Sequence, residues 1–242
     1  MKNAIRKLLR QLGIDVGLYA NSDFAKIKQF LDYHQIDLVL DVGANTGQYY
    51  KFLRYLGYSG RVVSFEPLGD AYAQLIKVSK KSSSWEIAPR TAIGNSEGEI
   101  SINIAGNSQS SSVLPMLDRH KKAYPESIYI GSETVKITRL DYIAPHYIAD
   151  NNTVFLKVDV QGYEQQVLEG AKGILPYVKG IQLEMSLVPL YQEELLFREM
   201  LDYMENLGYS LYWLKPVITD PTTGQALQVD GIFLNHESLP NK

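Results

Sequence analysis

Short apolar runs alternate along the chain with segments whose apolar residues recur every three or four positions. The runs predict buried strands, because each is four to nine residues long and is bounded by turn residues. They lie at 38–43, 61–67, 85–93, 153–160 and 180–186. The helical spacing predicts helices over 46–56, 70–81, 163–171 and 193–206. Two last strands, 209–215 and 228–235, are joined by a loop rich in turn residues.

Strands and helices in this order predict an α/β fold. The expected sheet is mostly parallel, has helices on both faces and is closed by an antiparallel C-terminal hairpin. Residues 98–150 break the rhythm, since they read as a half-exposed strand, a loop with one helical turn, and a further strand leading into a short helix. Ligands bind at the carboxyl ends of the strands in such sheets. We therefore expect this inserted segment to form a lid or a substrate platform.

The N-terminal segment has the pattern of a basic amphipathic helix. Ile5, Leu8, Leu9 and Leu12 share one helix face, and charged residues interrupt any signal-peptide-like apolar run. We expect a helical extension over 1–35, followed by a single domain over 36–242. Packing of this helix on its own domain or on a second copy is the favoured interpretation, which leaves a homo-oligomer open. Peripheral contact of residues 1–13 with an anionic membrane surface also stays open.

Composition narrows the class of protein. Hydrophobic residues make up 45% of the 242 residues and charged residues 21%, which is typical of a globular chain with a sizeable core. The net charge of −3 argues against a nucleic-acid partner. With no cysteine, disulfides, thiolate metal sites and a cysteine nucleophile are excluded. No stretch reaches the ~18 apolar residues that span a bilayer. We expect a cytoplasmic enzyme.

A glycine-containing loop follows the first strand, where a ligand is expected. It reads Asp41-Val42-Gly43-Ala44-Asn45-Thr46-Gly47. The two glycines permit a tight turn and close approach to a ligand, and the following helix turns free N–H groups toward the loop. The third glycine of a dinucleotide fingerprint is missing, and an acid ends the strand. This loop suits a cationic or hydroxyl-rich ligand better than a pyrophosphate.

Glu66 ends the second strand and is followed by Pro67. A carboxylate in this place can accept hydrogen bonds from both hydroxyls of a ribose. Together with the glycine loop it predicts an adenosine site. The pair does not separate S-adenosylmethionine from NAD.

A third motif carries a family resemblance. Residues 157–164 read KVDVQGYE and residues 167–171 read VLEGA, which closely resembles the signature of the FkbM family of S-adenosylmethionine-dependent methyltransferases. Further segments of the family pattern follow in order: DVGANTGQY, SFEP, AIGNSEGEI, SSSV, VKITRLDYI and QLEMS. The resemblance covers about residues 36–235. Gln161 is a departure, because many members carry Glu there, so an acid at this position is not indispensable.

The resemblance implies a seven-stranded Rossmann-like methyltransferase fold and O-methylation, commonly of sugar hydroxyls in polysaccharides, glycolipids or glycosylated metabolites. The expected acceptor is thus a glycan or small molecule. S-adenosyl-L-methionine is the implied cofactor, with the glycine loop on its methionine part and Glu66 on its ribose. The implied cofactor-binding residues are Asp41, Gly43, Asn45, Thr46, Gly47, Glu66, Pro67, Ala92 and Asp159.

Methylation of a hydroxyl needs an acceptor for its proton, which contributes ~10²–10⁴ in rate. Asp159 is the first candidate, since it ends the fourth central strand beside the expected methyl group. Its alternative role is to cap the following helix. Glu184 and His120 are the other catalytic candidates, although His120 also reads as an exposed loop residue.

Four further residues are candidates for substrate contact: Ser111, Ser112, Tyr163 and Glu164. Loop composition explains the serines almost as well, and the helix dipole can explain Glu164. Mg²⁺ stays open as a cofactor, because hard cations take oxygen ligands. No motif supports it, so we assign no metal ligand.

Two other functions stay open. One is a scaffold subunit that binds the cofactor but has lost catalysis; the retained Asp41, Glu66 and Asp159 argue against this loss. The other is an NAD-dependent oxidoreductase, which the missing third glycine disfavours.

Overall fold

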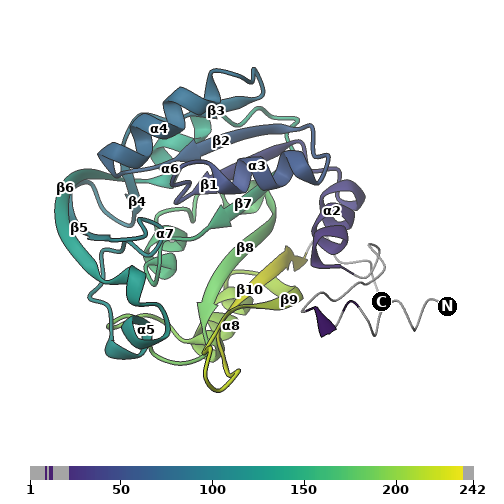
Figure 1. The fold of residues 1–242 in the computed structure, drawn as a ribbon. Coiled ribbons are helices and arrows are strands. Elements are labelled where there is room, and N and C mark those ends of the chain that lie inside the picture. Colours follow the sequence, from purple (N-terminus) through teal and green to yellow (C-terminus); the bar gives the residue numbers. More distant parts are fainter. Residues whose placement is uncertain (1–8, 10, 13–21, 237–242) are drawn as a thin grey trace.

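A seven-stranded sheet forms the centre of the molecule, with the strand order β3-β2-β1-β7-β8-β10-β9 (Figure 1). The computed structural model describes residues 9, 11–12 and 22–236. Its strands are β1 (Leu38–Val42), β2 (Arg61–Phe65), β3 (Trp85–Ile87), β7 (Val154–Val158), β8 (Val178–Ser186), β9 (Tyr209–Thr219) and β10 (Ala226–Asn235). β3, β2, β1, β7 and β8 run parallel, whereas β10 is antiparallel to both β8 and β9. The predicted sheet with its antiparallel C-terminal hairpin is confirmed.

The sequence of the central strands explains their place. Every residue of β1 (LVLDV) and of β7 (VFLKV) is buried, as expected for parallel strands covered on both faces. Successive residues of β1 enter different cores: Leu38 and Leu40 pack in one cluster, and Val39 packs in the other. Two cores on opposite faces of one sheet explain why helices are needed on both sides.

Helices cover both faces of this sheet. The helices of the described residues are α2 (Asp23–Tyr33), α3 (Gln48–Tyr55), α4 (Gly69–Ser79), α5 (Asp118–Ala123), α6 (Leu140–Ile143), α7 (Glu164–Glu169) and α8 (Phe197–Asn206), with short 3₁₀ turns η2 (Pro125–Ser127), η3 (Ala144–His146) and η4 (Leu175–Tyr177). Of these, α5 lies in the inserted segment, away from the central sheet (Figure 1). The helix predicted over 193–206 begins only at Phe197, because Glu194 instead accepts backbone hydrogen bonds from Leu190 and Tyr191. Among the described residues, no helix has the length and apolar character to cross a membrane.

The single strand predicted over 85–93 is wrong. The segment forms two strands in different sheets, since Pro89 lies between them and has no N–H to donate to a ladder. β3 joins the central sheet. β4 (Ala92–Gly94) joins β5 (Gly98–Ala105) and β6 (Tyr129–Arg139) in a three-stranded sheet of order β4-β6-β5. The inserted segment therefore has a sheet of its own beside the central one (Figure 1).

The predicted N-terminal amphipathic helix lies almost wholly outside the described residues. Of its apolar positions, Leu9 and Leu12 are described, and Leu12 is exposed. The second half of the expected extension is described as α2, which packs on the central sheet. Phe30 of α2 is fully buried, and its ring lies 5.6 Å from that of Phe155 in β7. The division of the chain near residue 35 stays a prediction.

Candidate functional site

The carboxyl ends of β1, β2 and β7 meet at one edge of the sheet, where the sequence motifs lie. Backbone hydrogen bonds tie the loops together beyond the strand ends. The N–H of Gly43, after β1, donates to the carbonyl of Phe65 at the end of β2 over 3.1 Å. The N–H of Asp159, after β7, donates to the carbonyl of Val42 over 3.1 Å. The three loops thus form one connected rim.

Packing explains both glycines of the loop. Gly43 has φ +80°, and a Cβ there would lie 1.9 Å from the carbonyl oxygen of Asp159. Gly47 has φ +84°, and its Cβ would lie 2.3 Å from the ring of Trp85. Both backbones are left-handed and closely packed, so only glycine fits. From the sequence, we expected a ligand to occupy the space beside these glycines. In the structure, protein atoms occupy it.

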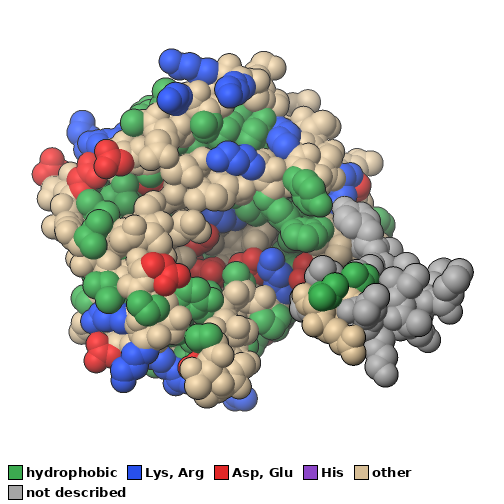
Figure 2. Space-filling view, in the orientation of Figure 1, with side chains coloured by type: hydrophobic (Ala, Val, Ile, Leu, Met, Phe, Trp, Pro, Cys, Tyr) green, Lys and Arg blue, Asp and Glu red, His purple; other side chains and the backbone are tan. Residues whose placement is uncertain are grey.

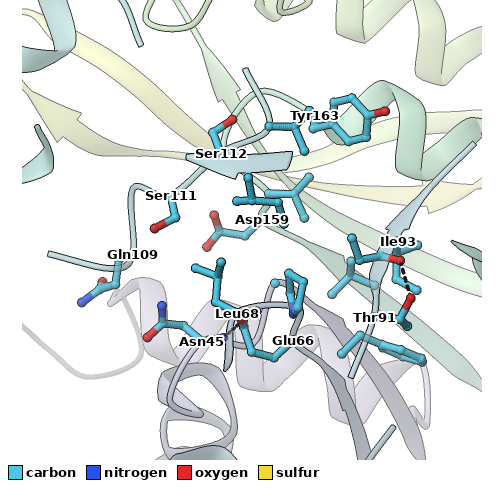
Figure 3. Close-up of a pocket in the computed structure, with 18 of the residues that line it drawn as sticks. Asn45, Glu66, Leu68, Thr91, Ile93, Gln109, Ser111, Ser112, Asp159 and Tyr163 are labelled. Atoms are coloured by element: carbon cyan, nitrogen blue, oxygen red, sulfur yellow. Dashed lines mark hydrogen bonds between the residues drawn. The ribbon is translucent and has the colours of Figure 1, made fainter. Parts of the chain in front are cut away.

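A narrow pocket opens above this rim, beneath the inserted segment (Figure 3). Its walls carry both apolar side chains and a few polar groups. It is lined by Val42, Gly43, Asn45, Phe65, Glu66, Pro67, Leu68, Thr91, Ala92, Ile93, Ile102, Ser108, Gln109, Ser111, Ser112, Val113, Asp159, Val160 and Tyr163. We call it the nucleoside pocket, after the ligand that the sequence motifs predict.

Most of the expected cofactor residues line the nucleoside pocket: Gly43, Asn45, Glu66, Pro67, Ala92 and Asp159. Asp41, Thr46 and Gly47 are not among its lining residues. Three residues expected to contact substrate, Ser111, Ser112 and Tyr163, line this pocket instead of a separate one. Figure 3 shows the hydroxyl of Tyr163 pointing away from the pocket, so that its ring faces the cavity.

Glu66 is fixed on the floor of the nucleoside pocket. Its two carboxylate oxygens accept backbone hydrogen bonds from Asn45 and Leu68, each over 2.8 Å. The side chain is 4% exposed, and burial raises its pKa to about 7 in spite of these two donors. Each carboxylate oxygen has a second lone pair, so Glu66 can still accept two hydroxyl donors from a ligand.

A second and wider cavity lies beside the first; we call it the cleft. It encloses about 470 Å³, within the usual size of ligand sites. Its lining includes amides, carboxylates, tyrosines and the tip of the C-terminal hairpin. Among these residues are Asn45, Gln48, Tyr49, Phe52, Gln109, His120, Tyr124, Lys157, Asp159, Gln161, Gln182, Glu184, Val217, Ile218 and Asp230. Figure 2 shows acidic side chains gathered in the hollow at the centre of this face.

Asp159 lines both cavities and lies at their junction. Lys157 is placed between two carboxylates, with its Nζ 3.4 Å from Asp159 and 3.3 Å from Asp41. Burial alone would lower the pKa of Lys157, but these two carboxylates outweigh it and hold the pKa above its usual value. Lys157 therefore stays charged. Asp41 is fully buried behind the rim, and burial raises its pKa.

The helix-capping alternative for Asp159 is not supported. The N-cap of α7 is Tyr163, four positions further on, and no side chain caps this helix. The Asp159 side chain is 37% exposed, and besides Lys157 it contacts Gln161, whose amide donates to its Oδ1 over 2.8 Å. The carboxylate is thus aimed at the two cavities.

Gln161 connects both sides of the cleft, and the sequence did not single it out as a contact residue. It has φ +58° and is 8% exposed. Its Nε2 donates to Asp159 over 2.8 Å and to Glu184 over 2.6 Å. Its Oε1 accepts from the hydroxyl of Tyr191 over 2.7 Å, and its backbone carbonyl accepts from Ser112 over 2.6 Å. The carboxamide is held in one orientation by these partners.

Two other polar residues of the cleft were missed, Gln182 and Asp230. Gln182 accepts from the hydroxyl of Tyr49 over 2.8 Å and donates to Asp230 over 3.2 Å. Asp230 also contacts Lys215 at 3.6 Å, and burial raises its pKa to about 6. These residues are far apart in the sequence and meet only through strand pairing. Side chains alternate between the two faces of β8, which places Gln182 on the same face as Glu184. This alternation is the sequence signal that could have predicted Gln182 as a residue of the site.

His120 of α5 lies in the wall of the cleft. The loop interpretation expected it to be exposed, but it is 1% exposed, and neither ring nitrogen has a hydrogen-bond partner among the described residues. Its ring lies 5.1 Å from that of Tyr191 in an edge-to-face arrangement. Burial lowers its pKa to about 4, so the imidazole is neutral near pH 7.

Glu164 lies apart from both cavities. It is buried at the start of α7, where its Oε1 accepts backbone hydrogen bonds from Val160 (3.1 Å) and Gly162 (3.2 Å). Burial raises its pKa to about 8. In this structure Glu164 shapes the loop that carries Asp159. Within the described part of the chain, no three acidic or histidine side chains are grouped so that they could hold a metal ion.

Among known protein families, the model described as the methyltransferase FkbM domain matches residues 41–211 of this chain. Sp1610 from Streptococcus pneumoniae, solved in complex with S-adenosyl-L-methionine, is 10% identical, with 90% of this chain and 74% of that chain covered and a TM-score of 0.51. Magnesium protoporphyrin IX methyltransferase from Synechocystis PCC 6803, solved with the same ligand, is 10% identical, with coverages of 97% and 96% and a TM-score of 0.47.

At this low identity, the likeness to Sp1610 concerns the fold alone, and it identifies that fold as the Rossmann-like fold of methyltransferases. A sequence search of curated proteins gave no match.

Proposed function

Because this chain belongs to the FkbM methyltransferase family, we propose that it transfers a methyl group from S-adenosyl-L-methionine to a hydroxyl group of a sugar. One observation carries this proposal. A single carboxylate, Asp159, lies at the junction of a narrow pocket and a wider cleft. A two-substrate transfer needs this arrangement, with one cavity for the donor, one for the acceptor and a proton acceptor between them.

The nucleoside pocket fits the donor. Apolar side chains such as Phe65, Leu68 and Ile93 suit the faces of a flat base, and Glu66 suits the two hydroxyls of a ribose. The two backbone donors keep the Glu66 carboxylate in place before any ligand arrives. Bound S-adenosyl-L-methionine would supply a methyl group that is already strongly electrophilic, so the protein has to position the acceptor and remove its proton.

Asp159 is the group that takes the acceptor proton in this proposal. Lys157 pairs with its carboxylate and the amide of Gln161 donates to its Oδ1, so the group is held in place at the junction of the two cavities. His120 is a weaker candidate, because its burial disfavours the charged form that a base must adopt. As the hydroxyl oxygen gains the methyl group, its proton moves to Asp159.

The cleft suits a neutral polyhydroxyl acceptor. Carboxylates and amides, such as those of Asp159, Gln161 and Gln182, can exchange hydrogen bonds with several hydroxyls at once. Tyr49 and Tyr124 supply aromatic surface for the apolar face of a sugar ring. An acceptor with a phosphate would meet Asp159 and Asp230 at close range, which is unfavourable.

Two measurements test the proposal. Thermal shift and calorimetry should show stabilisation by S-adenosylmethionine and S-adenosylhomocysteine and none by NAD. Incubation with S-adenosylmethionine and a panel of methyl glycosides should then release S-adenosylhomocysteine, detected by mass spectrometry, and Asp159→Asn should abolish this release. Stabilisation by NAD would instead support an oxidoreductase. Donor binding without transfer to any glycoside would support the inactive scaffold.

A further inference from the structure

Glu184 lies in a row of charged residues that runs across three strands. In the pairing of β8 with β10, Glu184 lies directly opposite Asp230, and in the pairing of β10 with β9, Asp230 lies opposite Lys215. Residues opposite one another share a face of the sheet, and two like charges in this relation repel. The only cation in this row, Lys215, lies opposite Asp230 and contacts it with its Nζ at 3.6 Å.

Lys157, the lysine that lines the cleft, is engaged as well, because it contacts Asp41 and Asp159. Within the described residues, Lys157 and Lys215 thus form their ion pairs with other carboxylates, and Glu184 takes part in none of these pairs. Its recorded polar contact is the neutral amide of Gln161, at 2.6 Å. Of the three carboxylates that line the cleft, Glu184 is the one without a cation.

The surroundings of Glu184 add further negative charge. The charges of Asp159 after β7, Asp230 in β10 and Glu164 in α7 act on it, and it also interacts with the phenol of Tyr191. Burial, followed by these three carboxylates, raises the pKa of Glu184 well above its usual value. The neutral His120 in the cleft wall offers no compensating charge. Burial of this side chain therefore costs the least free energy when its carboxyl group keeps a proton.

We propose that Glu184 carries a proton at neutral pH and donates it in a hydrogen bond to an oxygen of the acceptor next to the hydroxyl that is methylated. The Oε2 atom accepts from Gln161, which leaves the other oxygen to hold the proton toward the cleft. The two acids have separate roles: charged Asp159 accepts a proton, and Glu184 keeps its own. Environments that push two carboxyl groups apart in this way divide acid and base functions in other enzymes.

This assignment rests on the proposed function and narrows its substrate class. The acceptor presents an oxygen beside the reacting hydroxyl, as a vicinal diol or a hydroxy ether of a sugar ring does. A protonated carboxyl group matches such a neutral oxygen, because it can donate a hydrogen bond to that oxygen.

The protonation state can be measured without an acceptor. Protein labelled with ¹³C in the carboxyl groups of glutamate, saturated with S-adenosylhomocysteine, is titrated by NMR. We expect the Glu184 resonance, assigned by its absence in Glu184→Gln, to keep the protonated shift at pH 7, where exposed glutamates have lost theirs. Asp230→Asn should make Glu184 lose its proton at lower pH, because a neighbouring negative charge is removed. This second variant also assigns the resonance should Glu184→Gln not fold.

A Glu184 resonance that titrates together with the exposed glutamates overturns the assignment, whatever the enzyme does with glycosides. In the activity assay, Glu184→Gln should retain more activity than Glu184→Leu, because its carboxamide both accepts from Gln161 and donates into the cleft. Glu184→Leu, which can do neither, should raise the KM for the glycoside at least tenfold, with donor affinity unchanged. Loss of activity in Glu184→Gln equal to that in Asp159→Asn contradicts the proposal.

Discussion

The carboxylate of Asp159 has partners that hold it in place without covering it. Lys157 supplies the counter-ion and Gln161 supplies one hydrogen bond, while more than a third of the side chain stays exposed. A carboxylate in this environment is oriented and accessible, as a proton acceptor must be.

Asp159→Asn tests this role. Asparagine has the same shape and keeps the contact with Gln161, but it does not accept the proton, so we expect turnover to fall by ~10²-fold or more. The free energy of unfolding should change by less than about 1 kcal/mol, because the lost ion pair is partly exposed. Affinity for S-adenosylhomocysteine should stay near wild type. Single-turnover methyl transfer and calorimetry give the two values, and full activity would move the search to Glu184 and His120.

Glu66→Ala tests the donor pocket. Each charge-assisted hydrogen bond contributes ~1.5–3 kcal/mol, so the loss of one is expected to weaken S-adenosylhomocysteine binding by about 10- to 150-fold. Wild-type binding should also tighten as the pH rises through 7, because burial raises the pKa of Glu66 to about 7 and the ionised form is the better acceptor. Calorimetry at two pH values measures both effects. Unchanged affinity in the variant would exclude Glu66 from the site.

The sequence predicts those residues of the site whose positions follow from their neighbours in the chain. Glu66 and Asp159 follow strand ends directly, so their place follows from the strands themselves. Gln161 and Tyr191 form hydrogen bonds with partners that are distant in the chain, and no local sequence pattern predicts such contacts. The sequence showed Gln161 only as a missing acid. The structure shows what the amide adds, which is a donor shared between two carboxyl groups.

At the scale of elements, the glycine loop holds the ends of β1 and β7 together. Its left-handed turn at Gly43 brings the backbone against the carbonyl of Asp159. The position of Asp159 therefore depends on the absence of a side chain in the loop that follows the neighbouring strand. A substitution in this loop should act on the site through the backbone.

Gly43→Ala measures this dependence. Strain at a left-handed φ together with the clash against Asp159 should lower the free energy of unfolding by about 2–5 kcal/mol. Gly208→Ala is the matched control, because Gly208 has φ +87° and open space where its Cβ would lie. This control substitution should lower the free energy of unfolding by only about 1–2 kcal/mol, because a residue with a Cβ is less stable than glycine in a left-handed conformation. Equal losses in chemical denaturation would show that the contact with Asp159 contributes nothing.

The elements themselves were predicted well where they are buried and periodic. The predicted central strands 38–43 and 153–160 match β1 and β7 to within about two residues. Continuous apolar runs of this length are typical of parallel strands that are covered on both faces. The run at 85–93 failed because Pro89 divides it between two sheets. Which sheet a short strand joins is decided by its partners, and β6, the partner of β4, lies far along the chain.

At the scale of the whole molecule, buried acids should make the protein less stable as the pH rises. Burial raises the pKa of Glu66 to about 7 and that of Glu164 to about 8, whereas unfolded glutamates titrate near ~4.3. Above that value the folded state holds protons that the unfolded state has lost, so the stability they give disappears as the pH rises through the folded pKa values. We expect a loss of about 2 kcal/mol from these two residues between about pH 6.5 and pH 8.

Denaturant titrations across this range measure the loss. His120 does not interfere, because its pKa is lowered to about 4 and its contribution changes only below about pH 6.5. Glu164→Gln serves as the control: its amide oxygen can still accept from Val160 and Gly162, and the variant should show a visibly flatter pH dependence. Stability that rises from pH 6.5 to pH 8 in the wild-type protein would contradict the prediction.

The two cavities are built from different parts of the chain. The floor of the nucleoside pocket comes from the ends of parallel strands at the centre of the fold, where every change disturbs both cores. One wall of the cleft comes from α5 and another from Val217 and Ile218 near the tip of the β9–β10 hairpin. Insertions and substitutions there leave the strand ends intact. If the proposed function holds, changes in these peripheral segments would alter which acceptor fits, and the strand ends beneath the donor would keep their structure.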